Sequence, residues 1–126
     1  MANLKQVLIF GIAAFLIMTI GCSKSNGNNG NPPNYDNFAK CLTDNGVKFY
    51  GAFWCPHCAN QKEMFGKSFE NIDYIECSLP DKSGQTQVCI NAKIKAYPTW
   101  EFKDGLRIEG EQTLLQLSQK SGCKME

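Results

Sequence analysis

Two cysteines separated by two residues are the clearest candidates for chemistry in this sequence. They are Cys55 and Cys58, in the stretch FWCPHCANQ that covers residues 53–61. Paired cysteines at this spacing serve zinc sites, iron–sulfur sites and thiol–disulfide exchange. The spacing alone does not distinguish a metal site from a structural bridge or a redox pair. The elements that position the two thiols are therefore needed to distinguish these three roles.

A metal site needs further ligands, and the other cysteines do not offer them at a suitable spacing. A zinc ribbon would need a second closely spaced pair, whereas Cys77 and Cys89 are twelve positions apart. The sequence therefore predicts no metal and no other cofactor. It favours redox catalysis by Cys55 and Cys58 over metal binding or an inert bridge.

The apolar residues around the pair predict that it joins a buried strand to a helix. Residues 47–53, VKFYGAF, are nearly all apolar or aromatic, which is typical of a strand covered on both faces. After the pair, Cys58, Phe65 and Phe69 share one face of a helix, although Gly66 weakens or bends its middle. The two thiols are thus expected where that strand ends and the helix begins.

The other elements complete an α/β order. They are a helix over residues 36–42, a strand over 72–78, a polar loop over 79–87, a short helix over 88–96, a hairpin of strands over 98–102 and 106–110, and a last helix that a Thr113/Gln116 capping box opens and Gly122 ends. Strand, helix and strand followed by a hairpin and a closing helix is the thioredoxin order. The sequence therefore predicts one small thioredoxin-like α/β domain, a central mixed sheet flanked by helices.

The N-terminal part of the chain has the composition of an export signal. The apolar run over residues 7–21 is shorter than the roughly 20 apolar residues of a membrane-spanning helix. The residues up to Cys22 resemble the lipobox of bacterial lipoproteins, in which the cysteine is lipidated, although Thr19 stands where that pattern usually has leucine. We expect a lipoprotein signal peptide over residues 1–21 and lipidation at Cys22, or else an uncleaved signal anchor.

Both alternatives place the domain outside the cytoplasm and tied to a membrane, in a bacterial periplasm or cell envelope. Residues 22–35 are rich in Gly, Asn and Pro and predict a flexible polar tether, so the folded domain is expected over 36–126. Beyond Cys22, twelve Lys and Arg match twelve Asp and Glu. This balance gives no electrostatic case for nucleic acid, and we expect a monomer.

The predicted junction explains why a proline and a histidine separate the cysteines. If Cys55 caps the helix, Pro56 occupies the first helical position, where its missing N–H costs nothing. The sulfur of Cys55 then faces free N–H groups and the positive end of the helix dipole, which favours the thiolate over the thiol. His57 would tune this sulfur further if it points over it. Cys58, on the same face and more buried, suits a resolving thiol.

The same dipeptide bears on the direction of electron flow. A stabilised thiolate stabilises the reduced protein, so its disulfide becomes a stronger oxidant. Pro-His also separates the cysteines of DsbA, and this resemblance of Pro56-His57 implies an oxidant. Phe49 stands where thioredoxin has a buried aspartate, which makes reductase chemistry of the thioredoxin type less well supported.

A second motif, AYPTW over residues 96–100, stands at the position of the cis-proline of thioredoxin-like proteins. Only about 5–6% of X-Pro bonds are cis, so a cis Tyr97–Pro98 bond is expected from the fold and not from the dipeptide. It would present the backbone of Tyr97 to a substrate and keep metal away from the thiols. Trp54 is expected on the substrate-facing rim and Trp100 in the core.

Together these motifs resemble the thioredoxin-like domain that is fused to, or works beside, bacterial and plant homologues of vitamin K epoxide reductase (VKOR). The likeness covers most of residues 36–123 and is most specific over 49–66. It implies that the domain passes electrons from substrate thiols to a VKOR membrane protein and thence to quinone. In this chain a VKOR-like partner would be a separate protein.

The resemblance also implies an additional cysteine pair, Cys77 and Cys89, near the active site. We interpret it as a structural disulfide that closes the polar loop, with an electron relay from the redox pair as the alternative. Elimination then leaves Cys41 and Cys123 to pair with each other. That bridge would tie the first helix to the end of the last one.

The sequence thus predicts a membrane-tethered, extracytoplasmic thiol–disulfide oxidoreductase that oxidises dithiols of substrate proteins. A reductase or isomerase is the first alternative, because the same residues catalyse the reverse exchange when the redox partner is different. A non-catalytic module is the second alternative. It would be a metallochaperone or a peptide-holding domain that uses the Tyr97–Pro98 groove without turnover.

Overall fold

The computed structural model describes residues 33–125, so the predicted signal peptide, Cys22 and most of the predicted tether lie outside the described part. No helix within residues 33–125 has the length and apolar character needed to cross a membrane. Tyr35, which the sequence analysis assigns to the tether, packs against the core, and its N–H donates to Ser68 Oγ at 2.9 Å. Tyr35 is therefore part of the packed domain and not of the tether.

Four strands form one mixed sheet in the order β2-β1-β3-β4. The central strand β1 (Lys48–Gly51) pairs in parallel with β2 (Asp73–Glu76) and antiparallel with β3 (Thr99–Glu101). Strand β4 (Arg107–Glu109) closes the hairpin with β3. This α/β arrangement confirms the predicted thioredoxin-like fold.

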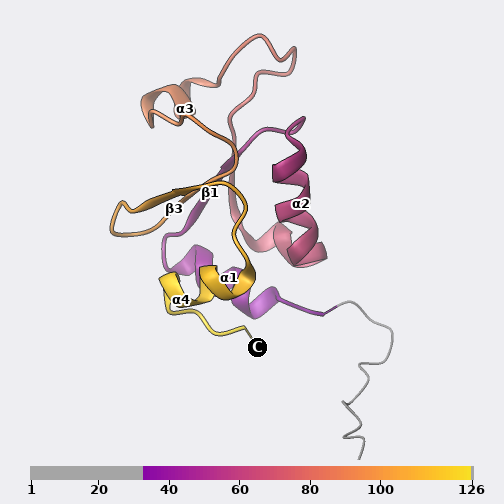
Figure 1. Cartoon of the computed structure of the whole chain (residues 1–126), viewed down its shortest axis with the longest axis vertical. Coiled ribbons are helices and arrows are strands. Elements are labelled where there is room, and N and C mark those ends of the chain that lie inside the picture. Colours follow the sequence, from indigo (N-terminus) through magenta and orange to yellow (C-terminus); the bar gives the residue numbers. More distant parts are fainter. Residues whose placement is uncertain (1–32, 126) are drawn as a thin grey trace, which may run out of the picture. The chain divides into compact units, whose positions relative to one another are not determined.

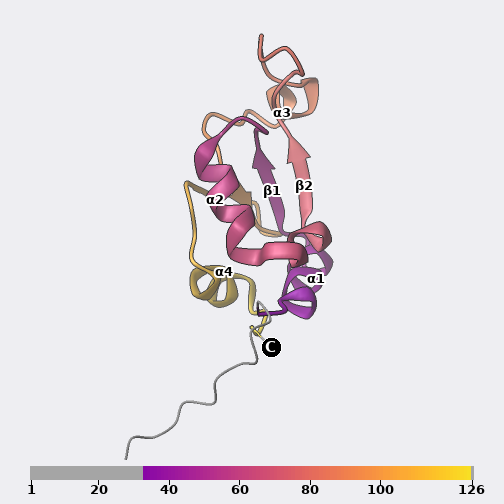
Figure 2. The ribbon, with the colours of Figure 1, turned by 90° about the vertical axis from the view of Figure 1, so that its right-hand side faces the viewer.

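The helices lie on the faces and at both ends of this sheet (Figures 1 and 2). Helix α2 (Pro56–Phe65) runs along one side of β1 and β2. Helices α1 (Asp36–Asp44) and α4 (Leu114–Ser121) lie at the end where β1 begins. The short α3 (Gln87–Asn91) lies at the opposite end, beyond the carboxyl ends of β1 and β2.

Local sequence signals account for the ends of these helices. Gly66, at φ 56°, ends α2, and a 3-10 helix (Gly66–Asn71) continues to β2, so the predicted weak point is a true helix end. The Thr113/Gln116 capping box opens α4, and Gly122 follows it in the left-handed conformation. Helix α3 is shorter than the predicted 88–96 helix, because residues after Asn91 turn back toward the sheet.

The core forms on the two faces of β1. On one face Phe49 packs edge-on against Trp100, with ring centroids 4.7 Å apart, and Phe65 of α2 also contacts Trp100. On the other face Tyr50 packs with the buried Cys77 and Cys89. Trp100 is fully buried, in agreement with its expected place in the core.

Two disulfides close the domain, and they join the pairs that the sequence analysis expects. Cys41 of α1 is bonded to Cys123 beyond α4, 82 positions away. Cys77 at the end of β2 is bonded to Cys89 of α3, 12 positions away. Among residues 33–125, the free cysteines are Cys55 and Cys58.

Candidate active site

Cys55 lies at the junction that the sequence predicts. It is the N-cap of α2, with extended backbone angles of φ −80° and ψ 120°, and Pro56 is the first helical residue. Its N–H donates to the carbonyl of Ala52 at 3.0 Å, and its carbonyl accepts the N–H of Ala59 at 3.1 Å. The sulfur is therefore fixed at the N-terminal end of α2, where unpaired N–H groups and the helix dipole favour a negative charge.

Cys58 is the more buried thiol of the pair. It is 1% exposed against 5% for Cys55 and belongs to the main core cluster. Burial raises the pKa of the Cys58 thiol to about 12, although a hydrogen bond with the backbone of Ala52 opposes the shift. At neutral pH Cys58 is thus a protonated thiol, and Cys55 is the sulfur that an incoming group can reach first.

Gly51 allows other groups to approach Cys58 closely. A Cβ at this position would lie 3.0 Å from the Tyr74 ring, 3.0 Å from the Phe49 ring and 3.2 Å from the sulfur of Cys58. An aromatic ring, Phe49, stands where thioredoxin has its buried aspartate. The ring of Tyr74, whose hydroxyl donates to Glu76, borders the same space beside Gly51 as Phe49 and the sulfur of Cys58. Burial, and then this bond to Glu76, raise the pKa of Tyr74.

The Tyr97–Pro98 segment, directly before β3, lies beside Cys55. The peptide bond is cis, and the thiol of Cys55 donates to the carbonyl of Tyr97 at 3.7 Å, a long contact of the kind that sulfur makes. Pro98 is fully buried, while Tyr97 is half-buried. Segments 42 positions apart in the chain therefore meet at the sulfur of Cys55.

Trp54 and Tyr97 form the rim beside Cys55. Their rings meet edge to face, with centroids 6.1 Å apart. Trp54 is 46% exposed and its neighbour Phe53 is 52% exposed. Apolar side chains are equally exposed elsewhere on the domain, for example Leu115 at 55%, so exposure alone assigns no role to this rim.

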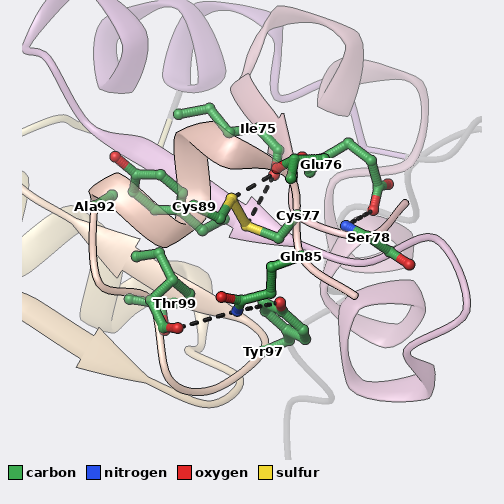
Figure 3. Close-up of a disulfide and its surroundings, with 12 residues drawn as sticks. Ile75, Glu76, Cys77, Ser78, Gln85, Cys89, Ala92, Tyr97 and Thr99 are labelled. Atoms are coloured by element: carbon green, nitrogen blue, oxygen red, sulfur yellow. Dashed lines mark hydrogen bonds between the residues drawn. A yellow bond between two sulfur atoms is a disulfide. The ribbon is translucent and has the colours of Figure 1, made fainter. Parts of the chain in front are cut away.

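The loop that the Cys77–Cys89 disulfide closes holds this rim in place (Figure 3). Trp54 Nε1 donates to Ser78 Oγ at 2.7 Å, and Gln85 Nε2 donates to the hydroxyl of Tyr97 at 2.5 Å. Ser78 and Gln85 pair with each other across the loop. Both aromatic residues of the rim are thus bonded to one small loop. No local sequence pattern predicts these bonds, because hydroxyl and amide side chains in a polar loop have many possible partners.

The carboxylate of Glu76 accepts three hydrogen bonds next to the rim. It accepts the N–H of Ser78 at 2.8 Å, the N–H of Phe53 at 3.2 Å and the hydroxyl of Tyr74. These bonds tie the residues before Cys55 to the end of β2. Sequence reasoning missed Glu76 because a single acidic residue in a strand is not distinctive.

His57 has a partner that the sequence analysis did not foresee. Its ring is exposed, and Nδ1 forms a hydrogen bond of 2.6 Å with Glu111 Oε1, which also accepts Asn60 Nδ2 at 3.2 Å. The hydrogen bond from His57 holds the pKa of Glu111 below its ordinary value, with a further contribution from Asn60. The Nδ1 side of the imidazole is thus directed to a carboxylate and not to the sulfur of Cys55.

Metal binding has little geometric support in the described part of the chain. Residues 33–125 hold no cluster of three or more His, Cys, Asp or Glu side chains that could ligate an ion. The arrangement suits a pair of sulfurs that bond to each other or to an incoming sulfur.

The comparisons with known proteins agree with the expected chemistry. The chain is similar to the thiol-disulfide oxidoreductase LTO1 of Arabidopsis thaliana, with 41% identity over 93 residues. The match covers 70% of this chain, which spans only 24% of the length of that relative. No protein-family model matches the chain.

Proposed function

We propose that this protein is a thiol–disulfide oxidoreductase that oxidises dithiols of exported proteins through a Cys55–Cys58 disulfide. The observation that carries the proposal is the placement of Cys55 at the N-terminus of α2, 3.7 Å from the carbonyl of Tyr97. That position stabilises a thiolate leaving group and places backbone beside it for an extended substrate. The name of the Arabidopsis relative supports the same class of reaction.

The first step is attack of a substrate thiolate on the sulfur of Cys55 in the oxidised protein. The Cys55–Cys58 bond breaks, a mixed disulfide forms between substrate and Cys55, and Cys58 leaves with the electron pair. Because burial raises the pKa of Cys58 to about 12, the leaving sulfur takes up a proton from solvent.

The second step releases the product. A second substrate thiolate attacks the substrate sulfur of the mixed disulfide, and Cys55 leaves as the thiolate that its helix position stabilises. The sum is one substrate dithiol oxidised and one protein disulfide reduced to two thiols. Two electrons and two protons must then leave the protein before the next cycle.

The proposal includes the cellular setting and the partner that removes these electrons. An export signal over residues 1–21, a lipid on Cys22 and a polar tether would hold the domain on the outer side of a membrane. A separate VKOR-like membrane protein would reoxidise Cys55 and Cys58. The resemblance to VKOR-associated domains supports this partner.

A reductase or isomerase is the second candidate, and one observation favours it. The carboxylate of Glu111 lies 2.6 Å from His57 Nδ1 and adds a negative charge beside the Pro-His dipeptide that otherwise suggests a strong oxidant. A weaker oxidant exchanges disulfides in both directions more readily. The redox partner would then decide the direction.

The test is oxidation of a reduced two-cysteine peptide by the pre-oxidised protein, followed as loss of free thiols. The wild type should consume two thiols per protein, and Cys55→Ser should consume none. Cys58→Ser, supplied as a Cys55 mixed disulfide with glutathione, should release glutathione and hold a one-cysteine version of the peptide as a mixed disulfide, because that peptide lacks the second thiol that would release it. Undiminished thiol oxidation by Cys55→Ser would overturn the proposal. Peptide that stays bound to Cys55→Ser without exchange would favour a binding module.

A further inference from the structure

Glu111 contacts the histidine between the two cysteines. Its carboxylate accepts hydrogen bonds from His57 at 2.6 Å and from Asn60 at 3.2 Å, both on the first turns of α2. These residues lie 54 and 51 positions away in the chain. A carboxylate thus lies beside the first turns of α2, the helix whose N-cap is Cys55.

Buried contacts fix the backbone that carries Glu111. Gln61 is fully buried on α2, and its Oε1 accepts the N–H of Gln112 at 2.7 Å. Its Nε2 donates to the carbonyl of Gln112 at 2.9 Å, and Trp100 Nε1 donates to the same Oε1 at 3.2 Å. The residue after Glu111 is therefore locked to the helix that carries His57. The backbone next to Glu111 is therefore fixed by buried hydrogen bonds.

Resting on the function proposed above, we propose that Glu111 is a positioning residue that holds His57 and makes the Cys55–Cys58 disulfide a weaker oxidant. The carboxylate binds the imidazole by Nδ1 and adds a negative charge beside it. Both effects oppose stabilisation of a thiolate at Cys55. Since the thiolate stabilises the reduced protein, the carboxylate favours the disulfide form.

The sign of this effect does not depend on the protonation state of His57. With Glu111 ionised, the pair carries no net charge when His57 is protonated and one negative charge when it is neutral. With glutamine at position 111, the pair carries one positive charge or none. Removal of the carboxylate therefore makes the surroundings of Cys55 one charge more positive at a fixed protonation state of His57, and leaves the net charge unchanged if His57 loses its proton together with the carboxylate; in neither case do the surroundings become more negative.

The experiment is a redox equilibrium with glutathione, with the Cys77–Cys89 disulfide left intact. One protein disulfide and two glutathione molecules give one protein dithiol and one glutathione disulfide. Glu111→Gln should shift this equilibrium constant roughly tenfold toward the reduced protein, which is about 30 mV for a two-electron couple. The matched control is Glu109→Gln, which removes the same charge from an exposed position on β4 and should leave the constant within about twofold.

A double-mutant cycle tests whether Glu111 acts through His57. In a His57→Ala background, Glu111→Gln should shift the constant much less than in the wild type. An unchanged constant in Glu111→Gln, an equal shift in Glu109→Gln, or a full tenfold shift without His57 would each overturn the inference. A wild type without a reversible Cys55/Cys58 couple would instead overturn the proposed function.

Discussion

The two disulfides of this domain lie at opposite ends of the sheet, and their surroundings differ. Cys41–Cys123 joins α1 to the chain beyond α4, at the end where β1 begins, and closes a loop of 82 positions. Cys77–Cys89 closes only 12 positions, but that loop holds both aromatic residues of the active-site rim. The first disulfide is thus expected to act on the stability of the whole domain, and the second on the geometry of the site.

The contrast teaches how a domain of about 90 residues can combine stability with a shaped site. A core of this size gives a thin margin of stability, which cross-links commonly supplement. A long loop gains the most from a cross-link in the chain-entropy model, while a short loop gains less and is ordered locally. A disulfide is therefore expected to stabilise the whole domain at one end of the sheet and to order the active-site loop at the other.

The largest loss of stability should follow removal of the Cys41–Cys123 disulfide, at the end of the sheet away from the active site. Replacement of Cys41 and Cys123 by alanine should lower the free energy of unfolding by about 4.5 kcal/mol, since the unfolded chain regains the entropy of a long loop. The rate of peptide oxidation by the remaining folded protein should stay within about twofold. Denaturant unfolding and thiol-loss assays measure the two quantities, and a large drop in rate at full folding would break the comparison.

Removal of the Cys77–Cys89 disulfide, which closes the loop that holds the rim, should lower stability less and activity more than removal of Cys41–Cys123. Replacement of Cys77 and Cys89 by alanine should lower the free energy of unfolding by about 3 kcal/mol. Peptide oxidation should slow by roughly tenfold or more, because Trp54 and Tyr97 lose their fixed positions. If the rate were unchanged, the loop would not position the rim. Loss of electron transfer to a membrane partner alone, with peptide oxidation intact, would point to the relay role instead.

A smaller change sharpens the comparison within the active-site end. Gly51→Ala should lower the free energy of unfolding by about 1–3 kcal/mol, because the new Cβ would press on Phe49, Tyr74 and Cys58 at 3.0–3.2 Å. The matched control is Gly84→Ala in the rim loop, whose Cβ would meet only a Leu79 methyl at 3.9 Å and should cost less than about 0.5 kcal/mol. Equal losses in both variants would show that the space beside Cys58 is not tightly packed.

The sequence was informative wherever local patterns decide the structure. The apolar run before Cys55 and the proline after it predicted the strand-to-helix junction, and the capping box at Thr113 predicted the start of α4. The fold followed because strand, helix and turn signals all agreed on one order of elements. Tyr97–Pro98 was found through that order.

Contacts between distant segments were not predictable in the same way. Glu111 meets His57 only because Gln61 locks the backbone of Gln112 to α2, and single glutamine and glutamate residues carry no periodic signal. The sequence analysis therefore considered His57 over the sulfur, whereas the structure gives its Nδ1 a carboxylate. Side-chain partners across more than 50 positions depend on the packed fold and not on local propensity.

The reduction potential of the Cys55/Cys58 couple, measured with Cys77–Cys89 oxidised, tests the central claim most directly. We expect one reversible two-electron couple between about −180 mV, the value of protein disulfide isomerase, and about −120 mV, the value of DsbA, because the N-terminus of α2 favours the thiolate and Glu111 moderates it. A value near that of thioredoxin, about −270 mV, would contradict the oxidising role. The absence of any reversible couple would contradict the assignment of Cys55 and Cys58 as a redox pair.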